Sequence, residues 1–91
     1  MRRIAIPFII MLVASCAAQG NAVVTGAGPD DMLKLRAGPS LAFNVILGLP
    51  DGTELNRREC VTELGQRWCR VSLAKAPAVT GFVSADYLSM R

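Results

Sequence analysis

Two cysteines placed symmetrically about a Leu64-Gly65 dipeptide constrain this sequence more than any other feature. If Leu64 and Gly65 form a two-residue turn between antiparallel strands, Cys60 lies directly opposite Cys69. In such a hairpin the pair beside the turn is hydrogen-bonded, and every second pair outward is not. Cys60 and Cys69 therefore occupy a non-hydrogen-bonded pair, where side chains approach most closely and a disulfide fits. Residues 57–73 predict a hairpin closed by a Cys60–Cys69 bridge.

The N-terminal residues predict a secretory signal. Arg2 and Arg3 form a basic start, residues 4–13 are apolar, and small residues follow at 14–18. An apolar run of that length is too short for a transmembrane helix, which needs about 20 residues. Export would place the cysteine pair in an oxidising compartment, where disulfides persist.

The end of the apolar run, V-A-S-C at residues 13–16, resembles the signal of bacterial lipoproteins. The resemblance implies that residues 1–16 form a lipoprotein-type signal and that Cys16 is lipidated as the new N-terminus. Ala17 beside it resembles lipoproteins sorted to the outer membrane. The alternative is ordinary cleavage after Ala18, and either route resolves the odd count of three cysteines. The expected location is the periplasm or cell envelope, with an outer-membrane lipid anchor in the first case.

The charge of the chain changes when the signal is removed. The full sequence has 10 Lys and Arg against 7 Asp and Glu, a net charge of +3. Loss of Arg2 and Arg3 leaves eight basic side chains against seven acidic ones. A mature charge near neutrality gives no basic surface of the kind that binds nucleic acid, so no nucleic-acid partner is expected.

Residues 17–31 are small, glycine-rich and uncharged until their end, which predicts a flexible tether. Residues 23–25 could add a short strand, but the composition favours the tether. The sequence G-A-G-P at 26–29 is not interpreted as a phosphate-binding loop, because no strand and helix flank it and proline lacks an N–H donor.

Residues 32–91 predict one all-β domain, a small five-stranded barrel that is closed or nearly closed. Alternating apolar and polar side chains mark strands, and no sustained helical period appears. A Pro50-Asp51-Gly52 turn follows the second strand, residues 74–78 form a loop, and residues 84–88 form one helical turn capped by Ser84. The five strands are predicted at 32–36, 43–49, 53–60, 68–73 and 80–83.

Strict alternation fails in the third strand. Leu55 should face the core, and counting forward in twos places Cys60 on the opposite face. Cys60 must nevertheless share a face with Cys69. A one-residue β-bulge between Asn56 and Glu59 resolves this conflict and is predicted there.

About sixty residues make a marginal core, so the disulfide should supply a large share of the stability. The predicted core consists of apolar side chains on the inward faces of the strands and the final turn: Leu33, Leu35, Val45, Leu49, Leu55, Val71, Phe82, Val83 and Leu88.

Four linked blocks of this domain resemble a bacterial SH3-like (SH3b) domain. They are L-x-L-R-x-G-P-S at 33–40, L-P-x-G-T at 49–53, W-C-R-V at 68–71 and G-F-V-S-x-x-Y-L at 81–88. The resemblance covers nearly all of the domain in order. It implies an SH3-like barrel and a role in the cell envelope, often as a targeting module for the cell wall.

The composition argues against catalysis. The chain contains no histidine, which excludes Ser-His-Asp and Cys-His nucleophiles and every His-containing zinc site. Cys60 and Cys69 are too far apart for a C-x-x-C redox motif, so their interpretation as a bridge is favoured. We expect no enzyme activity, no cofactor and no metal.

Binding is the remaining class. Trp68 lies on the strand face opposite Cys69, where an indole could stack on a sugar or hold a peptide; a half-buried Trp covering the barrel edge is equally compatible with the pattern. Arg70 shares that face and could contact a carboxylate. Tyr87, Arg36 and Ser40 complete the candidate set, although Tyr87 is better suited to packing its ring and bonding its hydroxyl to backbone.

The sequence therefore predicts a non-enzymatic, exported binding module that recognises peptidoglycan or peptide. The alternative is a protein–protein interaction or inhibitor domain that docks on an envelope protein. The expected partners are cell-wall glycan or peptide, or an envelope protein, with the membrane reached through the lipid on Cys16. A structural domain without a discrete ligand is the third interpretation.

Overall fold

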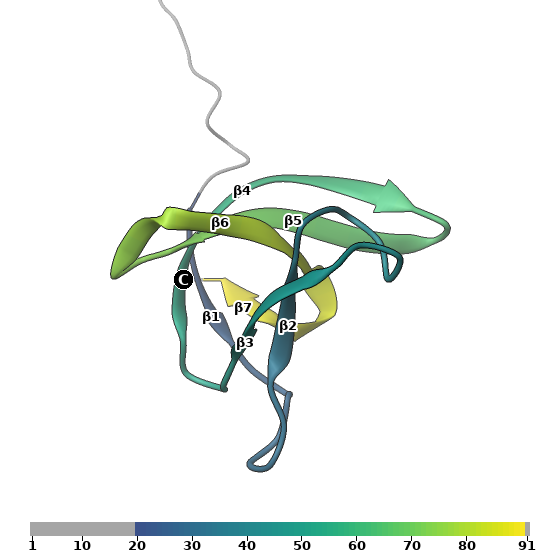
Figure 1. The fold of residues 1–91 in the computed structure, drawn as a ribbon. Coiled ribbons are helices and arrows are strands. Elements are labelled where there is room, and N and C mark those ends of the chain that lie inside the picture. The colour runs from purple at the N-terminus through teal and green to yellow at the C-terminus, as the bar shows by residue number, and fades with distance from the viewer. Residues whose placement is uncertain (1–19, 91) are drawn as a thin grey trace, which may run out of the picture.

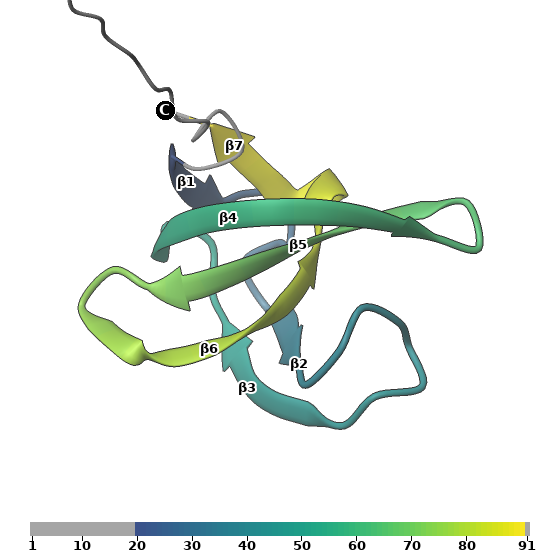
Figure 2. The ribbon, with the colours of Figure 1, turned by 90° about the horizontal axis from the view of Figure 1, so that it is seen from above.

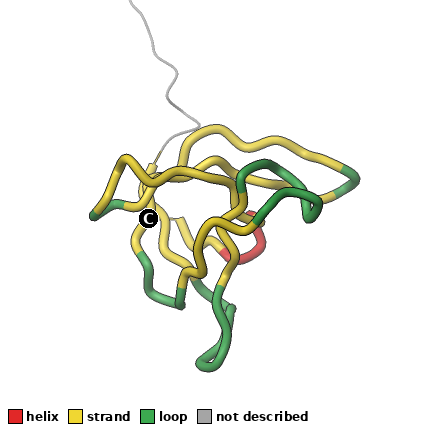
Figure 3. Tube along the Cα trace, viewed as in Figure 1, coloured by secondary structure: helices red, strands yellow, loops and turns green. Residues whose placement is uncertain are grey.

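Seven strands and one turn of 3-10 helix make up residues 20–90, the part of the chain that the computed structural model describes (Figures 1 and 3). In chain order they are β1 (Gly20–Val24), β2 (Leu33–Arg36), β3 (Val45–Leu49), β4 (Glu54–Glu63), β5 (Gln66–Leu73), β6 (Ala76–Ser84), η2 (Ala85–Tyr87) and β7 (Leu88–Met90). The predicted all-β class is confirmed. All five predicted strands are present, as β2 to β6, and β1 and β7 are additional.

The strands form a single antiparallel sheet in the order β3-β2-β6-β5-β4-β1-β7. Figures 1 and 2 show that this sheet curls on itself into a half-barrel, with β4, β5 and β6 forming its long, bent centre. Curling lets one face of the sheet enclose a core, because side chains that alternate along each strand then meet across the barrel. The two edges are β3 and β7.

The prediction of a flexible tether at residues 17–31 is wrong for its described residues 20–24. Residues 20–24 form β1, which pairs with β4 on one side and with β7 on the other. Ala22 and Val24 point into the molecule and are 1% and 0% exposed. The strand has no local turn to mark it, and its partners lie more than thirty residues away, so only tertiary pairing reveals it.

The β4–β5 hairpin has the predicted register. The turn lies at Leu64-Gly65, and a disulfide joins Cys60 to Cys69 with an S–S distance of 1.99 Å. The pairs outward from the turn are Glu63 with Gln66, Thr62 with Arg67, Val61 with Trp68 and Cys60 with Cys69.

The predicted bulge in β4 is also present. Arg57 pairs with Val71 and Cys60 pairs with Cys69, so Arg58 and Glu59 together face Arg70. The extra residue turns Cys60 toward Cys69 while Leu55, 1% exposed, stays in the core.

The core lies on the concave face of the half-barrel. Its fully enclosed members come from six strands and are Val24, Leu33, Leu35, Leu49, Leu55, Cys69, Val71 and Val83. Leu88 packs against this cluster, and Phe82 is half-buried. Six of the nine predicted core residues are thus buried.

Val45 was wrongly predicted as a core residue, since 47% of it is exposed. The reason is a second bulge. Leu35 pairs with Leu47 and the next residue, Arg36, pairs with Val45, which leaves Ile46 without an opposite residue. The bulge shifts the phase of β3 and places Val45 opposite the outward-facing Arg36.

The connection between β5 and β6 is shorter than predicted. Only Ala74 and Lys75 separate the strands, and β6 begins at Ala76 inside the predicted loop. Pro77 is tolerated there because the register shifts between Ser72 and Leu73, so residues 77–79 have no opposite partner in β5.

The final turn, η2, matches the sequence prediction. The Ser84 hydroxyl accepts a hydrogen bond from the Asp86 backbone N–H at 3.3 Å, which caps the turn. This turn redirects the chain from β6 to β7 and places Tyr87 at the rim of the barrel.

The predicted signal, its lipidation site Cys16 and residues 17–19 of the tether lie outside the described residues. Within residues 20–90 no helix is long and apolar enough to cross a membrane.

Candidate functional site

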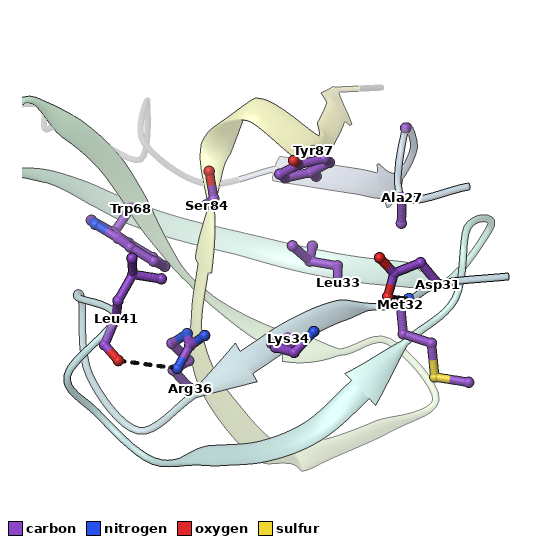
Figure 4. A pocket seen from close by; sticks show the side chains of 11 residues that line it. Ala27, Asp31, Met32, Leu33, Lys34, Arg36, Leu41, Trp68, Ser84 and Tyr87 are labelled. Carbon is purple, nitrogen blue, oxygen red and sulfur yellow. Dashed lines mark hydrogen bonds between the residues drawn. The ribbon is translucent and has the colours of Figure 1, made fainter. Parts of the chain in front are cut away.

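A pocket of about 230 Å³ opens at one rim of the half-barrel (Figure 4). Its walls come from the loop of residues 25–32, from β2, from the loop of residues 37–44 and from η2, and its far side is formed by the ends of β5 and β6. Segments far apart in the sequence therefore meet here. Three of the five predicted ligand-binding residues, Arg36, Trp68 and Tyr87, line this pocket.

The alternation of β2 explains its contribution. Leu35 points into the core with no exposed surface, so Lys34 and Arg36 point the other way, toward the pocket. Arg36 pairs with Phe82 of β6, which holds β2 against the centre of the sheet. Both cations thus come from one strand face.

Arg36 also shapes the pocket. Its Nη1 donates to the backbone carbonyls of Leu41 at 3.3 Å and Phe43 at 3.1 Å. These bonds fold the loop of residues 37–44 back over the sheet, and the dashed line to Leu41 is visible in Figure 4. No residue in the described range bonds the Nε or Nη2 donors of Arg36. The guanidinium can therefore hold the loop and still bind an anionic group in its fork geometry.

Trp68 lies on the predicted strand face, opposite Cys69, but it is not an exposed platform. Only 5% of the residue is exposed, and it is not a member of the main core cluster. In Figure 4 the side chain of Leu41 points toward the indole. Trp68 is therefore a buried residue that lines the pocket, which is closer to the alternative of a Trp that covers the barrel edge than to an exposed stacking platform.

Tyr87 lies at the other end of the pocket and is 40% exposed. Its ring packs on Gly26, where an added Cβ would meet the ring Cδ1 at 3.6 Å. Its hydroxyl has no hydrogen-bond partner among residues 20–90, contrary to the expectation that it bonds to backbone. Tyr87 therefore offers both a ring face and a free hydroxyl to the pocket.

The other two predicted ligand-binding residues lie elsewhere. Ser40 organises the 37–44 loop: its hydroxyl accepts from the Ala42 N–H at 2.9 Å, and its carbonyl accepts from the Phe43 N–H at 3.3 Å. Arg70 pairs with Glu59 across the β4 bulge, with Nε–Oε2 at 2.6 Å and Nη2–Oε1 at 3.0 Å.

The Arg70–Glu59 pair has an electrostatic consequence. The hydrogen bond from Arg70, with a smaller contribution from its charge, lowers the pKa of the Glu59 carboxyl below its ordinary value. Both side chains are substantially exposed, so this is a surface ion pair across the bulge, and Arg70 lies outside the rim pocket.

Several residues that line the pocket were not predicted from the sequence, among them Asp31, Lys34 and Leu41. Asp31 belongs to the stretch interpreted as a tether. Its loop is ordered by the Asp51 carboxylate, whose two oxygens accept from the N–H groups of Ala27 at 2.9 Å and Gly28 at 3.0 Å. Asp51 in the Pro50-Asp51-Gly52 turn is the one sequence feature that could have indicated an ordered loop here. Its hydrogen-bond partners are 23 and 24 residues away, so the sequence does not identify them.

The same contacts bear on the G-A-G-P segment. Two of its backbone donors, Ala27 and Gly28, already bind a carboxylate of the chain itself. They are not free to hold a phosphate, which agrees with the rejection of a phosphate-binding loop.

The pocket combines two cations, Lys34 and Arg36, with one carboxylate, Asp31, and the aromatic ring of Tyr87. Such a lining suits a ligand that carries an anionic group and an apolar or sugar face. Among residues 20–90 no group of three or more Cys, Asp and Glu side chains is placed to hold a metal ion.

Comparisons of the chain with protein-family models, with curated proteins and with solved structures find no match.

Proposed function

We propose that this chain is a non-enzymatic binding module of the cell envelope and that its rim pocket takes a peptide or peptidoglycan segment. One observation carries the proposal. The pocket unites Arg36, Trp68 and Tyr87, three of the five residues whose side-chain chemistry marks them in the sequence as candidates for binding. Independent convergence of binding-type side chains on one concave site is the pattern expected of a ligand pocket.

The contacts favour a ligand with a carboxylate. The unbonded donors of Arg36 and the ammonium of Lys34 attract it, and Asp31 disfavours a purely anionic chain. The ring of Tyr87, which is 40% exposed, suits an apolar side chain or a sugar face. Peptidoglycan stem peptides carry carboxylates beside sugars, so they match this description.

Binding to purified cell-wall sacculi tests the proposal. Lys34→Ala and Tyr87→Ala should each reduce retention of the protein several-fold, since both side chains are exposed and line the pocket. Lys75→Ala and Leu64→Ala are the matched controls, because they remove the same kind of charge or an exposed apolar group away from this pocket. Equal retention of pocket and control variants would exclude the pocket, and no retention of the unmodified protein would exclude the ligand.

The half-barrel is proposed to be a bacterial SH3-like domain. Its support is the order of the four matching blocks, which fall in β2 and the loop after it, the β3–β4 turn, β5, and the β6–η2 segment. The additional strands β1 and β7 extend the sheet at the edge of β4.

Export and lipidation complete the proposal. The Cys60–Cys69 disulfide favours an oxidising compartment. The mass of the protein extracted from membranes tests this directly. A lipid-modified Cys16 at the N-terminus is the expected result. An unmodified start at Gln19 would instead indicate cleavage after Ala18, and retention of residues 1–16 would contradict both cleavage sites.

Docking on an envelope protein is the second candidate, and one feature favours it. Leu64 is 100% exposed at the tip of the disulfide-closed β4–β5 hairpin. A rigid hairpin that presents an apolar side chain suits insertion into a partner's pocket. A photo-reactive residue at position 64 should then crosslink to one dominant envelope protein, whereas one at Lys75 should not.

A further inference from the structure

A second cavity, of about 280 Å³, lies beside the start of β1 and shares no lining residue with the rim pocket. Its lining consists of one glycine, two asparagines and two arginines: Gly20, Asn21, Asn56, Arg57 and Arg58. None of these residues carries a carboxylate or a large apolar side chain. Guanidinium and carboxamide N–H groups are donors to the oxygens of phosphates and carboxylates. The cavity therefore favours an anionic polar group.

The two arginines reach one cavity although they are consecutive in β4. Consecutive strand residues normally point to opposite faces of a sheet. The pairing of β4 with β5 shifts directly after Arg57, where the bulge begins, and both side chains line the cavity. Two positive charges are thus held at one place on the surface.

The two guanidinium groups have different roles within the fold. The Nε of Arg57 donates to the Met90 Sδ at 3.0 Å, and its Nη2 lies near Gly20, where an added Cβ would be 3.8 Å away. The Nε of Arg58 is buried without a partner, and no residue between 20 and 90 hydrogen-bonds the rest of that guanidinium. Arg58 can therefore bind an anion without breaking a hydrogen bond of the fold.

The nearest carboxylate does not neutralise this pair of charges. Glu59 follows Arg58, but both of its oxygens accept hydrogen bonds from Arg70, at 2.6 and 3.0 Å. The hydrogen bond from Arg70 is the largest cause of the lowered pKa of Glu59, and the charge of Arg58 is the smallest. The cavity therefore keeps its positive charge.

The distance along the chain to the predicted lipidation site indicates what this cavity meets. Cys16 lies four positions before Gly20. Four residues span at most about 14 Å when fully extended. A lipid on Cys16 would therefore keep Gly20, and the Arg57 guanidinium beside it, within about that distance of the phospholipid headgroups. Cations so close to an anionic membrane surface are attracted to it.

We propose that Arg57 and Arg58 form a docking site for the headgroup phosphates of anionic phospholipids. The proposal rests on the proposed lipidation of Cys16: the lipid supplies attachment, and the arginines fix which side of the domain faces the membrane. β1 starts at this cavity and leads to the loop of residues 25–32, which borders the rim pocket (Figure 1). Docking at the start of β1 therefore leaves that loop at the end of the strand farther from the lipid.

Vesicle binding by a singly acylated chain tests the proposal. The chain from Cys16 onward contains all the described strands and the core, and Cys16 is its one free thiol when Cys60 and Cys69 are bonded. Coupling that thiol to a tetradecyl maleimide gives an anchor that alone binds membranes only marginally. Co-sedimentation then measures what the arginines add. We expect tighter binding to phosphatidylcholine vesicles that contain phosphatidylglycerol than to vesicles of phosphatidylcholine alone.

Arg58→Gln should weaken binding to the phosphatidylglycerol vesicles about fivefold, the effect of removing one cation near an anionic surface. Arg67→Gln is the matched control, because it removes the same charge from an exposed arginine outside the cavity, and it should leave binding unchanged. Arg58→Lys keeps the charge and should retain most of the binding. High salt should remove the difference between the two glutamine variants by screening.

Two results would overturn the proposal. One is the absence of any preference for phosphatidylglycerol vesicles. The other is equal weakening by Arg58→Gln and Arg67→Gln, which would mean that net charge, and not this cavity, determines binding.

A second pair of variants gives a test if circular dichroism shows that Arg58→Gln does not fold. Asn21→Asp places a negative charge in the cavity at an exposed residue and should weaken binding several-fold. Asn44→Asp makes the same change at an exposed residue outside the cavity and should not. Equal binding by these two variants would contradict the docking site.

The vesicle measurement does not depend on processing in the cell, because the acyl chain is attached to Cys16 chemically. Failure of docking is therefore distinguished from failure of lipidation, which the mass of the extracted protein reports. An unmodified start at Gln19 would remove the anchor and contradict membrane docking in the cell.

Discussion

The two hairpins of this domain are organised in opposite ways. The β4–β5 hairpin has a two-residue turn and a disulfide four residues from it on either strand. The β2–β3 hairpin has an eight-residue loop, no disulfide, and an arginine side chain that holds the loop from within. Each contains one bulge. In the first hairpin local chemistry fixes the register, and in the second the register depends on the rest of the sheet.

This difference separates stability from binding. The β4–β5 hairpin is closed covalently and supplies Cys69 and Val71 to the core. The β2–β3 hairpin supplies Arg36 and Leu41 to the pocket, and its edge strand leaves Val45, Ile46 and Leu47 exposed. A loop that is held by hydrogen bonds alone can adjust to a ligand, whereas a disulfide-closed hairpin provides a fixed frame for it.

Removal of the disulfide should have the largest effect. The double variant Cys60→Ala, Cys69→Ala should lose about 2–3 kcal/mol of unfolding free energy, the loop-closure estimate for a ring of about ten residues. The thermal midpoint should fall by roughly 10–20 °C for a domain of this size. Reduction of the unmodified protein should give the same shift, and an unchanged midpoint would show that the bridge does not stabilise the fold.

Arg36→Met tests the β2–β3 hairpin, whose loop is held by hydrogen bonds and not by a disulfide. Loss of two charge-assisted hydrogen bonds to the Leu41 and Phe43 carbonyls should cost about 1–3 kcal/mol. Amide hydrogen exchange should accelerate in residues 37–44 and not in the β4–β5 hairpin. Arg70→Met is the control, since its surface pair with Glu59 should contribute less. If the amides of residues 37–44 are equally protected from exchange in both variants, Arg36 does not hold this loop.

Leu64→Asn should stabilise the β4–β5 turn. Leu64 has a φ of 52°, in the left-handed region that asparagine tolerates better than leucine, and Gly65 follows at 81°. We expect a gain of about 0.5–1 kcal/mol in chemical denaturation. Leu64→Ala removes the same exposed side chain without the asparagine preference, so it should give no gain. If alanine stabilises equally, exposure rather than backbone strain is responsible.

Sequence reasoning was accurate where a feature is local. The hairpin register, the Cys60–Cys69 bridge and the β4 bulge follow from spacing along one short stretch, and the structure contains all three. The predictions were wrong where long-range contacts determine whether a strand forms or which way a side chain faces. β1 exists because β4 and β7 pair with it, and Val45 is exposed because β3 bulges against β2.

The same division applies to the pocket. Arg36, Trp68 and Tyr87 could be selected by side-chain chemistry, because large amphipathic groups are rare in this chain. Asp31 and Leu41 could not, because their positions depend on how two irregular loops fold. One loop is held by the Asp51 carboxylate and the other by Arg36.

The smallest predicted effect concerns pH and the bulge of the β4–β5 hairpin. Arg70 lowers the pKa of Glu59 in the folded state, so the pair stabilises the fold above the ordinary carboxyl value of 4.5. That contribution is lost as the pH falls through the lower, folded-state pKa, because protonation removes the charge. Glu59→Gln should therefore lower the thermal midpoint slightly at neutral pH and not at strongly acidic pH.

Glu63→Gln is the control. Glu63 lies on the same strand without an ion pair among the described residues, so this variant should show no such pH dependence. High salt should reduce the Glu59 effect by screening, and a difference that persists in acid would mean that packing at the bulge, not charge, accounts for it.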